Sequence, residues 1–472
     1  METSVFTPNT RVHMIGIKGA GMTALAELLT LRGAHITGSD VPEKFYTDAL
    51  LKKLGIKYRE SFDPKNIPAK TDIVIYSTAY SKEKNPELAH AHTLGIPVMS
   101  YPQAVGKLTE TMMTLAVCGT HGKTTTSALL ADTLRAIGAD PSAIVGSRIV
   151  SWNGSALAGR GKYLVLEADE YQNKLAEYAP FGVILTSVDW DHPDFFKTKE
   201  AYLEVFKAFV MKIPRHGILV YCSDSRDVID VALEAECQKF SYGFLEGADF
   251  LIQNNVVHAT EGVLPQDGIT QTFTVNHAGT ELGEFSLQLA GRHNALNATA
   301  VIALLTGLRE NTEKMEKALS RFRGTERRFE YLGERFGALV YDDYAHHPEE
   351  IRTTLQAFRA LYPKRRLKVF FHPHTFTRTK ALLDDFAQSF DDADQIWLLP
   401  IYGSAREKQG GVSSEDLADK INRYFPGKAQ MIPDDREAFL EEFQSGLGKN
   451  DLVVTLGAGD VWKLSHKLAR KS

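Results

Sequence analysis

The residues best suited to chemistry in this chain form a glycine-rich turn that carries a lysine and a threonine. The run Gly119-Thr120-His121-Gly122-Lys123-Thr124-Thr125 follows an apolar stretch at 114–117 and precedes an apolar-periodic helix over 127–136. Backbone N–H groups in such a turn face phosphate, while the lysine meets the outer phosphates and the threonine hydroxyl meets Mg²⁺. The full P-loop pattern also wants a glycine where this chain has Val117. This partial P-loop motif predicts ATP binding.

A second glycine-rich turn lies near the N-terminus. Gly16, Gly19 and Gly21 follow an apolar stretch at 12–15, and Asp40 ends the next such stretch. That order is typical of a nucleotide-diphosphate site, although the spacing is Gly-x-x-Gly-x-Gly rather than the dinucleotide pattern. Glycines needed only for tight helix–strand packing are the alternative. A nicotinamide-dependent oxidoreductase is disfavoured by the spacing and leaves the lysine turn unexplained, so the two turns indicate two phosphorylated ligands.

Acidic and histidine residues follow two further apolar stretches. Glu167 follows the stretch at 163–166, and His192 follows the one at 181–188. Because strand ends gather at the ligand crevice of a parallel sheet, both are predicted to lie near Thr124 and bind metal. Hydroxyl and carboxylate oxygens suit Mg²⁺, whereas a histidine indicates a second metal position or tolerance of Mn²⁺. A solvated loop acid at Glu167 and a capping or core histidine at His192 are the alternatives.

Alternating strands and helices must position these motifs. The pattern predicts an α/β protein with parallel sheets, and 472 residues suggest about three domains. We place a Rossmann-like nucleotide-binding domain at 1–109, a central P-loop-type ATP-binding domain at 110–323, and a C-terminal Rossmann-like domain at 324–472. Predicted strands lie at 12–15, 34–40, 72–76, 97–99, 114–117, 163–166, 181–188, 337–343, 367–371, 395–399 and 451–456, with short β segments at 250–290. Predicted helices lie at 22–32, 127–136 and 294–308.

Composition and charge exclude other classes of protein. A net charge of −5 gives no reason to expect nucleic acid as a partner. Three cysteines without metal spacing favour a reducing cytoplasm over a disulfide framework. No run approaches about 18 apolar residues, and the N-terminus lacks a signal-peptide pattern, so we expect no membrane insertion. The oligomeric state is not indicated.

These motifs together resemble the Mur ligase family of peptidoglycan synthesis, and the resemblance covers essentially the whole chain. The stretches that carry it are 16–22, 38–40, 119–125, 167–171, 191–194, 291–294 with Asn297, 327–330, 342–348, 372–379 and 456–460. Members of the family normally lack the P-loop glycine at the position that Val117 occupies here. The resemblance implies an ATP- and Mg²⁺-dependent ligase that joins L-alanine to the lactyl carboxylate of UDP-N-acetylmuramate through an acyl phosphate.

The resemblance also implies roles for individual residues. The UDP-sugar would be bound by Gly16, Gly19, Ala20, Gly21, Met22, Ser39 and Asp40. ATP would be bound by residues 119–125, Asn294, Asn297, Arg328 and Asp343, and metal by Thr124, Glu167 and His192. The catalytic set would be Lys123, Glu167, His192, Arg328, Asp343 and His346. Helix capping is the alternative for the two asparagines.

The amino acid carboxylate needs a cation, which the resemblance assigns to Arg378 with His374 as its helper. A surface salt bridge is the alternative for Arg378. Thr375 stands where some family members carry an arginine, which leaves the details of acceptor recognition, L-alanine against glycine or L-serine, open. Lys207 lies at the spacing from His192 where relatives carry a carbamylated metal-binding lysine, with an exposed helix lysine as the alternative.

Two other functions remain open within this resemblance. A recycling ligase would join UDP-N-acetylmuramate to a ready-made tripeptide, and a catalytically silent sensor would bind the UDP-sugar without turnover. The stretches 372–379 and 402–407 favour the alanine-adding reaction. The silent sensor is disfavoured because Lys123, Thr124, Glu167, His192 and Asp343 are all present.

Overall fold

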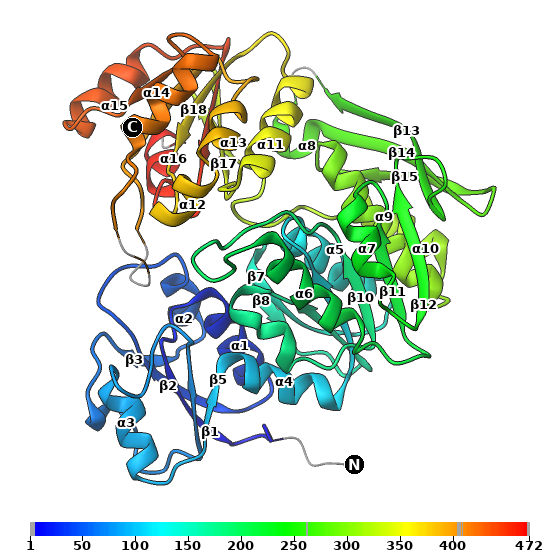
Figure 1. Ribbon diagram of the computed structural model, residues 1–472, viewed down its shortest axis with the longest axis vertical. Coiled ribbons are helices and arrows are strands. Elements are labelled where there is room, and N and C mark those ends of the chain that lie inside the picture. The colour runs from blue at the N-terminus through cyan, green and yellow to red at the C-terminus, as the bar shows by residue number, and fades with distance from the viewer. Residues whose placement is uncertain (1–4, 261–262, 404–406, 408, 470–472) are drawn as a thin grey trace. The chain divides into compact units, whose positions relative to one another are not determined.

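The computed structural model describes residues 5–260, 263–403, 407 and 409–469 (Figure 1). Contacts between residues divide the chain into two compact units. The first comprises Met1–Val188, Leu203–Phe250 and Ala298–Ala318, and the second comprises Asp189–Tyr202, Leu251–Asn297 and Leu319–Ser472. In the part of the chain that is described, no helix combines the length and the apolar character needed to cross a lipid bilayer.

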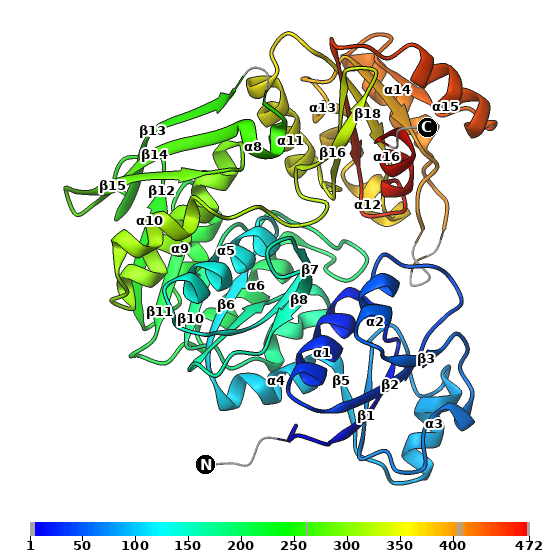
Figure 2. The same cartoon turned by 180° about the vertical axis from the view of Figure 1, so that it is seen from behind.

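The first unit opens with a five-stranded parallel sheet in the order β3-β2-β1-β4-β5. Its strands are β1 (Arg11–Ile15), β2 (His35–Ser39), β3 (Lys57–Arg59), β4 (Ile73–Tyr76) and β5 (Val98–Ser100). Its helices are α1 (Ala20–Leu31), α2 (Asp48–Lys53), α3 (Pro86–Thr93) and α4 (Tyr101–Thr111), with a 3₁₀ turn η1 (Pro64–Asn66). The chain runs outward from β1 in both directions, so the ligand crevice of such a sheet lies beyond the ends of β1 and β4. Figure 2 shows this blue part from behind.

The strands of the second sheet that belong to this unit run in the order β12-β11-β10-β6-β9-β7-β8. These are β6 (Met113–Cys118), β7 (Ser142–Ile149), β8 (Gly154–Leu157), β9 (Tyr163–Glu167), β10 (Gly182–Leu185), β11 (Ile218–Cys222) and β12 (Gln238–Gly243). Its helical segments are α5 (Lys123–Ala136), η2 (Tyr171–Glu177), α6 (Lys199–Val210), α7 (Arg226–Ala232), α9 (Arg292–Gly307) and α10 (Thr312–Leu319). Helices α6, α9 and α10 each have residues in both units. Neighbouring strands in this order pair parallel, except that β8 pairs antiparallel with β7.

The second unit contains a six-stranded sheet in the order β16-β17-β21-β18-β19-β20. Its strands are β16 (Glu330–Arg335), β17 (Ala338–Asp343), β18 (Arg366–Phe371), β19 (Gln395–Leu398), β20 (Ala429–Met431) and β21 (Asp451–Leu456), and only β16 is antiparallel. Its helices are α11 (Pro348–Leu361), α12 (Phe376–Ala381), α13 (Leu383–Gln388), α14 (Ser414–Tyr424), α15 (Arg436–Ser445) and α16 (Trp462–Ala469). A segment of β13 (Phe250–Ala259), β14 (Ile269–His277) and β15 (Thr280–Leu287), with α8 (Pro265–Gly268), belongs to this unit from Leu251 onward, and β14 and β15 pair antiparallel.

Alternate residues of the six-stranded sheet enter two separate cores. Val369 and Phe371 face a core built with α11, α13 and α14, whereas Phe370 faces one built with α15 and α16. A parallel sheet covered on both faces needs apolar residues at successive positions, which explains the continuous apolar run in β18. The β13–β15 segment packs on the same body through Ile269, Ala290 and Leu361.

The structure confirms the predicted α/β class with three parallel or mostly parallel sheets. Each strand predicted from an apolar run corresponds to an observed strand. The sequence missed β3, β7, β8, β11, β12, β16 and β20, and α5 begins at Lys123, four residues before the predicted start of the helix. A prediction from apolar residues missed this first turn because Thr124, Thr125 and Thr126 are buried although they are polar.

Candidate active site

The phosphate turn between β6 and α5 requires glycine at two positions. Gly119 has φ +131°, and a Cβ there would lie 2.2 Å from Thr186 Oγ1. Gly122 has φ +76° and precedes the first residue of α5. The backbone N–H groups of Thr120 and His121 donate to the carbonyl and the hydroxyl of Ser187, each at 2.9 Å. The turn is therefore held against the end of β10 with the N-terminus of α5 available to phosphate.

Lys123 is buried in this turn and paired with an acid that the sequence interpretation did not select. Its ammonium donates to the carbonyl oxygens of Gly119 and Thr120 and to Glu170 Oε2, the last two at 3.0 Å. Burial alone would lower the pKa of Lys123, but the carboxylates of Glu170, Asp169 and Glu167 raise it. The lysine therefore stays charged, as a phosphate ligand must. The signal in the sequence was the group of three acids, Glu167, Asp169 and Glu170, at the end of β9.

Thr124 and Glu167 lie together, as predicted for a metal site. Thr124 Oγ1 donates to Glu167 Oε1 at 2.7 Å, and Gly146 N–H donates to Glu167 Oε2 at 2.6 Å. A hydroxyl and a carboxylate side by side form a hard oxygen donor pair, which fits Mg²⁺. His192, with φ +55°, belongs to the second unit, and its part in metal binding stays a prediction.

The N-terminal turn is closely packed by aromatic rings. A Cβ at Gly16 would lie 2.7 Å from the Tyr80 ring, and a Cβ at Gly21 would lie 2.8 Å from the Tyr101 ring. Asp40 Oδ2 accepts from Lys18 N–H at 2.6 Å, and its Oδ1 accepts from Tyr80 Oη at 3.2 Å. Asp40 therefore shapes the turn through its own carboxylate.

The other predicted residues of this turn are mostly enclosed. Ser39 is buried and donates its hydroxyl to the buried Glu87. Gly19 precedes α1, and Ala20 and Met22 lie in its first turn, where Met22 is buried. The Ser39 side chain is thus engaged inside the fold, and the assignment of Gly16 and Gly19 to a diphosphate site stays a prediction.

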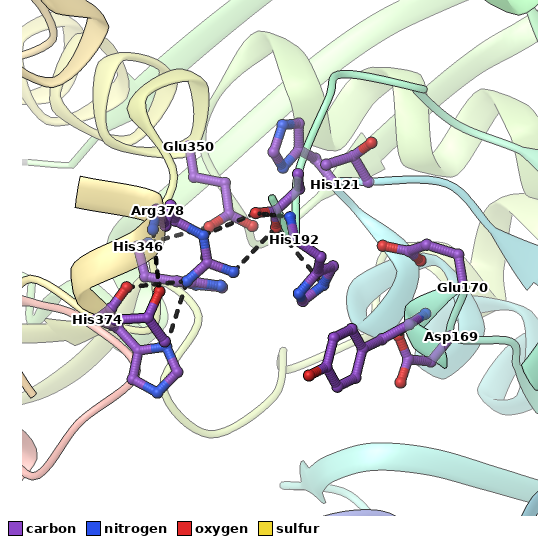
Figure 3. Close-up of polar contacts among 12 residues, drawn as sticks. His121, Asp169, Glu170, His192, His346, Glu350, His374 and Arg378 are labelled. Atoms are coloured by element: carbon purple, nitrogen blue, oxygen red, sulfur yellow. Dashed lines mark hydrogen bonds and ion pairs between the residues drawn. The ribbon is translucent and has the colours of Figure 1, made fainter. Parts of the chain in front are cut away.

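In the second unit, Arg378 is buried rather than exposed. It is 3% exposed, and its Nε and Nη2 donate to the two carboxylate oxygens of Asp191 at 2.7 and 3.1 Å. Its Nη1 donates to the carbonyl oxygen and Nδ1 of His374 at 3.1 and 3.2 Å (Figure 3). Burial would raise the pKa of Asp191, but the Arg378 charge holds it well below its usual range. The surface salt bridge considered for Arg378 is therefore wrong.

The hydrogen bonds determine the tautomers of two histidines. Arg378 can only donate, so His374 Nδ1 carries a lone pair. His346 Nδ1 lies 3.0 Å from the Tyr344 carbonyl, which can only accept, so this nitrogen carries the proton and Nε2 carries the lone pair. Burial lowers the pKa of both imidazoles, and the Arg378 charge adds to this at each. These shifts in pKa favour the neutral form of both imidazoles, although Glu350 opposes the shift at His346.

Glu350, which the sequence interpretation did not select, links His346 and Arg328. Its Oε2 accepts from the backbone N–H of His346 at 3.0 Å and lies 3.2 Å from His346 Nδ1, and its Oε1 lies 3.6 Å from Arg328 Nη1. Figure 3 shows Glu350, His346, His374 and Arg378 grouped together. They follow β17 and β18, which flank β21 in the sheet, so the sheet edge gathers them.

Arg328 is presented by an unusual stretch of backbone. Arg327 and Phe329 on either side have φ of +58° and +53°, which non-glycine residues rarely adopt. Asp343 holds this stretch by accepting from Phe329 N–H at 2.7 Å. Burial raises the pKa of Asp343 to about 6. Backbone strain of this kind is common at active sites, where it fixes the position of a functional side chain. This supports a functional role for Arg328.

Glu330, next to this stretch, should make stability depend on pH. Burial raises its pKa to about 7. Because the folded pKa exceeds the unfolded one, the protonated folded form is favoured, and stability is lost as pH rises through 7, by up to about 1.4 kcal/mol per pH unit. Glu330→Gln should flatten the dependence of melting temperature on pH between 5 and 8, while Glu334→Gln, exposed on the same strand, should not. An unchanged pH dependence in Glu330→Gln would contradict this assignment.

Asn294 and Asn297 lie within α9 rather than at its N-cap. Asn294 Nδ2 donates to the Ala290 carbonyl at 2.8 Å, and Asn297 Nδ2 lies 3.3 Å from Asn294 Oδ1. Both are buried. Since α9 begins at Arg292, the helix-capping alternative is wrong, and adenine recognition stays a prediction.

Lys207 lies on α6 beside acids. Its ammonium is 2.8 Å from Glu204 Oε1, and the hydrogen bond to Glu204 raises its pKa although desolvation opposes this. Carbamylation needs a neutral amine, which this environment disfavours. The stretch 402–407 can be followed only in part, because Ser404, Ala405 and Arg406 lie outside the described residues.

Comparison with known proteins extends over the whole chain. The models of the Mur ligase family catalytic domain, the Mur ligase middle domain and the Mur ligase glutamate ligase domain match residues 11–112, 117–305 and 327–459. UDP-N-acetylmuramate–L-alanine ligase of Desulfitobacterium hafniense is 43% identical, covering 97% of this chain and 99% of that protein. The enzyme of the same name from Treponema pallidum is 38% identical, covering 97% and 96%.

Solved structures agree with this match. The UDP-N-acetylmuramate–alanine ligase of Thermotoga maritima superimposes with a TM-score of 0.79 at 25% identity, covering 97% of this chain and 98% of that one. A murein peptide ligase from Psychrobacter arcticus shares the fold, with a TM-score of 0.72 at 23% identity, covering 98% and 100%. With two glycine-rich turns and a buried arginine in one chain, these full-length matches lead to one conclusion: the chain belongs to the Mur ligase family.

Proposed function

We propose that this protein is an ATP-dependent ligase that joins L-alanine to the lactyl carboxylate of UDP-N-acetylmuramate, forming ADP and phosphate in peptidoglycan precursor synthesis. The observation that carries the proposal is the full-length similarity to ligases of that name, at up to 43% identity. The two glycine turns account for two phosphorylated substrates. Arg378, held by Asp191 and His374, accounts for a small amino acid substrate with a carboxylate.

The chemistry requires a better leaving group than a carboxylate oxygen. The lactyl carboxylate attacks the γ-phosphorus of ATP, ADP leaves, and an acyl phosphate results. The amine of L-alanine then attacks the acyl carbon, and phosphate leaves with the C–O bond electrons. Lys123, kept charged by Glu170, neutralises the transferring phosphoryl group, which is the main contribution a protein makes to such a step.

An amino acid in solution carries an ammonium, which must lose a proton before it can attack. His346 suits this step because its Nδ1 proton is directed to the Tyr344 carbonyl and Nε2 carries the lone pair. Its lowered pKa keeps that lone pair available near pH 7. We assign Asp343 and Arg328 to the nucleotide phosphates, and Asn294 and Asn297 to adenine.

Arg378 is our candidate for the amino acid carboxylate, with one requirement. Its three nitrogens make four hydrogen bonds, to Asp191 and His374. An incoming carboxylate therefore has to accept at least one of the Arg378 hydrogen bonds that Asp191 accepts. Planar, bidentate binding of a carboxylate is what an arginine offers and a lysine does not.

We propose that Mg²⁺ is bound by Thr124 and Glu167, with His192 as a further ligand, and that Mn²⁺ can replace it. When bound with ATP, the ion would neutralise the β- and γ-phosphate oxygens. The Thr124 Oγ1–Glu167 Oε1 distance of 2.7 Å supports this, because both oxygens can turn to one cation.

Glu167→Gln is expected to raise the Mg²⁺ concentration needed for half-maximal activity by about tenfold or more, since a neutral amide is a weaker ligand for a hard cation. The measurement is a Mg²⁺ titration at saturating ATP. Glu204→Gln, exposed on α6, serves as the matched control. An unaltered Mg²⁺ requirement in Glu167→Gln would remove Glu167 from the metal site.

The function itself is tested by phosphate release from Mg-ATP with UDP-N-acetylmuramate and a panel of acceptors. The panel is L-alanine, glycine, L-serine and the L-Ala-γ-D-Glu-diaminopimelate tripeptide. We expect release to require both the UDP-sugar and L-alanine. Release with the tripeptide only would identify a recycling ligase, and no release with any acceptor would identify a UDP-sugar sensor.

The roles of the three domains and the cellular location of the protein follow from the same assignment. We propose that 1–109 binds the UDP-sugar, 110–323 binds ATP, and 324–472 binds the amino acid, a division supported by family models at 11–112, 117–305 and 327–459. We place the protein in the bacterial cytoplasm, because ATP and nucleotide sugars are made there.

A further inference from the structure

Lys18, in the middle of the N-terminal glycine turn, is a fully buried lysine that the proposed mechanism does not use. Its side chain is 0% exposed. A charged ammonium is expensive to bury unless several acceptors replace its water. A residue of this kind inside a substrate-binding turn therefore needs an explanation.

The acceptors of Lys18 come from the loops after two different strands. Its Nζ donates to the carbonyl oxygens of Val41 at 2.8 Å and Glu43 at 3.0 Å, in the loop after β2. It also donates to Glu60 Oε1 at 3.0 Å, just after β3. Lys18 itself follows β1. One ammonium therefore ties together the carboxyl ends of β1, β2 and β3.

The backbone of Lys18 strengthens the same link. Its N–H donates to Asp40 Oδ2 at 2.6 Å, and its carbonyl accepts from Thr47 Oγ1 at 2.5 Å. The ring of Phe45 lies 6.0 Å from Nζ. The loop from Val41 to Thr47 has no helix or strand of its own, so Lys18 supplies contacts that regular structure does not.

Lys18 cannot act as a phosphate ligand in this arrangement. Its ammonium is enclosed, and its charge is already balanced by Glu60 and by Asp48 at 3.7 Å. The diphosphate is instead left to the backbone N–H groups around Gly19. The contribution of Lys18 is thus to the shape of the crevice.

We propose that Lys18 is a positioning residue for the UDP-sugar, which holds the 41–47 loop against the glycine turn and so builds one wall of the nucleotide crevice. This inference rests on the proposed function for the identity of the sugar nucleotide. The wall lies beside the crevice that the strand order places at the ends of β1 and β4. If the 41–47 loop is no longer held in place, binding of the UDP-sugar should weaken while binding of ATP stays unchanged.

The test is Lys18→Met, which keeps the length and apolar body of the side chain but removes its three hydrogen bonds. We expect the KM for UDP-N-acetylmuramate, and the Kd for UDP measured by calorimetry, to rise about tenfold or more. kcat and the KM for ATP should stay near those of the unmodified protein. Lys57→Met is the matched control, because Lys57 is exposed on β3, outside the 41–47 loop, and should change neither constant.

A second variant covers the case in which Lys18→Met does not fold. Glu60→Gln removes one charged partner from a partly exposed position and should raise the same two constants by a smaller factor. Unchanged UDP affinity in a folded variant, or equal losses for UDP and ATP, would overturn the proposal. Absence of phosphate release by the unmodified protein would instead count against the proposed ligase function, because UDP calorimetry reads the crevice without turnover.

Discussion

Lys123→Met should lower kcat/KM for ATP by about a thousandfold or more, the largest effect expected of any single substitution in this protein. The variant removes the only charge that the phosphate turn itself brings to the transferring group. It also leaves the buried carboxylate of Glu170 without its ammonium partner at 3.0 Å. ATP would still meet the backbone N–H groups of the turn, so its binding should weaken less than turnover.

The measurement is single-turnover phosphate release beside ATP binding by calorimetry. Lys174→Met is the matched control, because Lys174 pairs with Asp169 in the same acidic run but lies outside the phosphate turn. A second variant, Glu170→Gln, should lower kcat/KM for ATP by less than Lys123→Met and by more than Lys174→Met. Turnover in Lys123→Met within a few-fold of the unmodified protein would contradict a catalytic role for the lysine.

Arg378→Lys should raise the KM for L-alanine by about a hundredfold, while the KM for ATP changes little. Lysine keeps the positive charge facing Asp191 but cannot form the two parallel bonds that a planar guanidinium makes to a carboxylate. It should also lose the bonds from Nη1 to His374, 3.1 and 3.2 Å long. Geometry rather than charge is therefore what the variant changes.

L-Alaninamide distinguishes recognition of the carboxylate from general damage. The unmodified protein should strongly prefer L-alanine over this amide, and Arg378→Lys should lose most of that preference. Arg352→Lys, on an exposed pair with Glu349 in α11, is the control. A preference for L-alanine that survives in Arg378→Lys would assign Arg378 to the Asp191 ion pair alone.

The buried pair also has a consequence for stability. Removing the arginine altogether leaves the carboxylate of Asp191 without its partner inside the protein, which costs about 3–5 kcal/mol for pairs of this kind. Arg378→Ala is therefore expected to report on folding as much as on binding. For this reason lysine, with the charge retained, is the informative replacement.

Much of the fold could be predicted from local patterns. The strands β1, β6, β9, β10, β17, β18 and β21 were visible as apolar runs because a parallel sheet covered on both faces buries every residue. Short strands with polar residues, such as β3 (Lys57–Arg59) and β20 (Ala429–Met431), carry no such signal. Their pairing comes from neighbouring strands rather than from their own composition.

The sequence by itself determined the two glycine turns and membership of the family, because these depend on residue types at short spacing after apolar runs. It also predicted that Thr124 and Glu167 lie together although they are 43 positions apart, because each follows a strand whose carboxyl end lies at the same end of a parallel sheet. Only the tertiary structure decided the partners of the buried charges. Arg378 meets Asp191 across 187 positions of the chain, and Lys18 meets Glu60 across 42. No local pattern records such pairs, since they form only when folding brings distant loops together and the cost of burying each charge selects an opposite one.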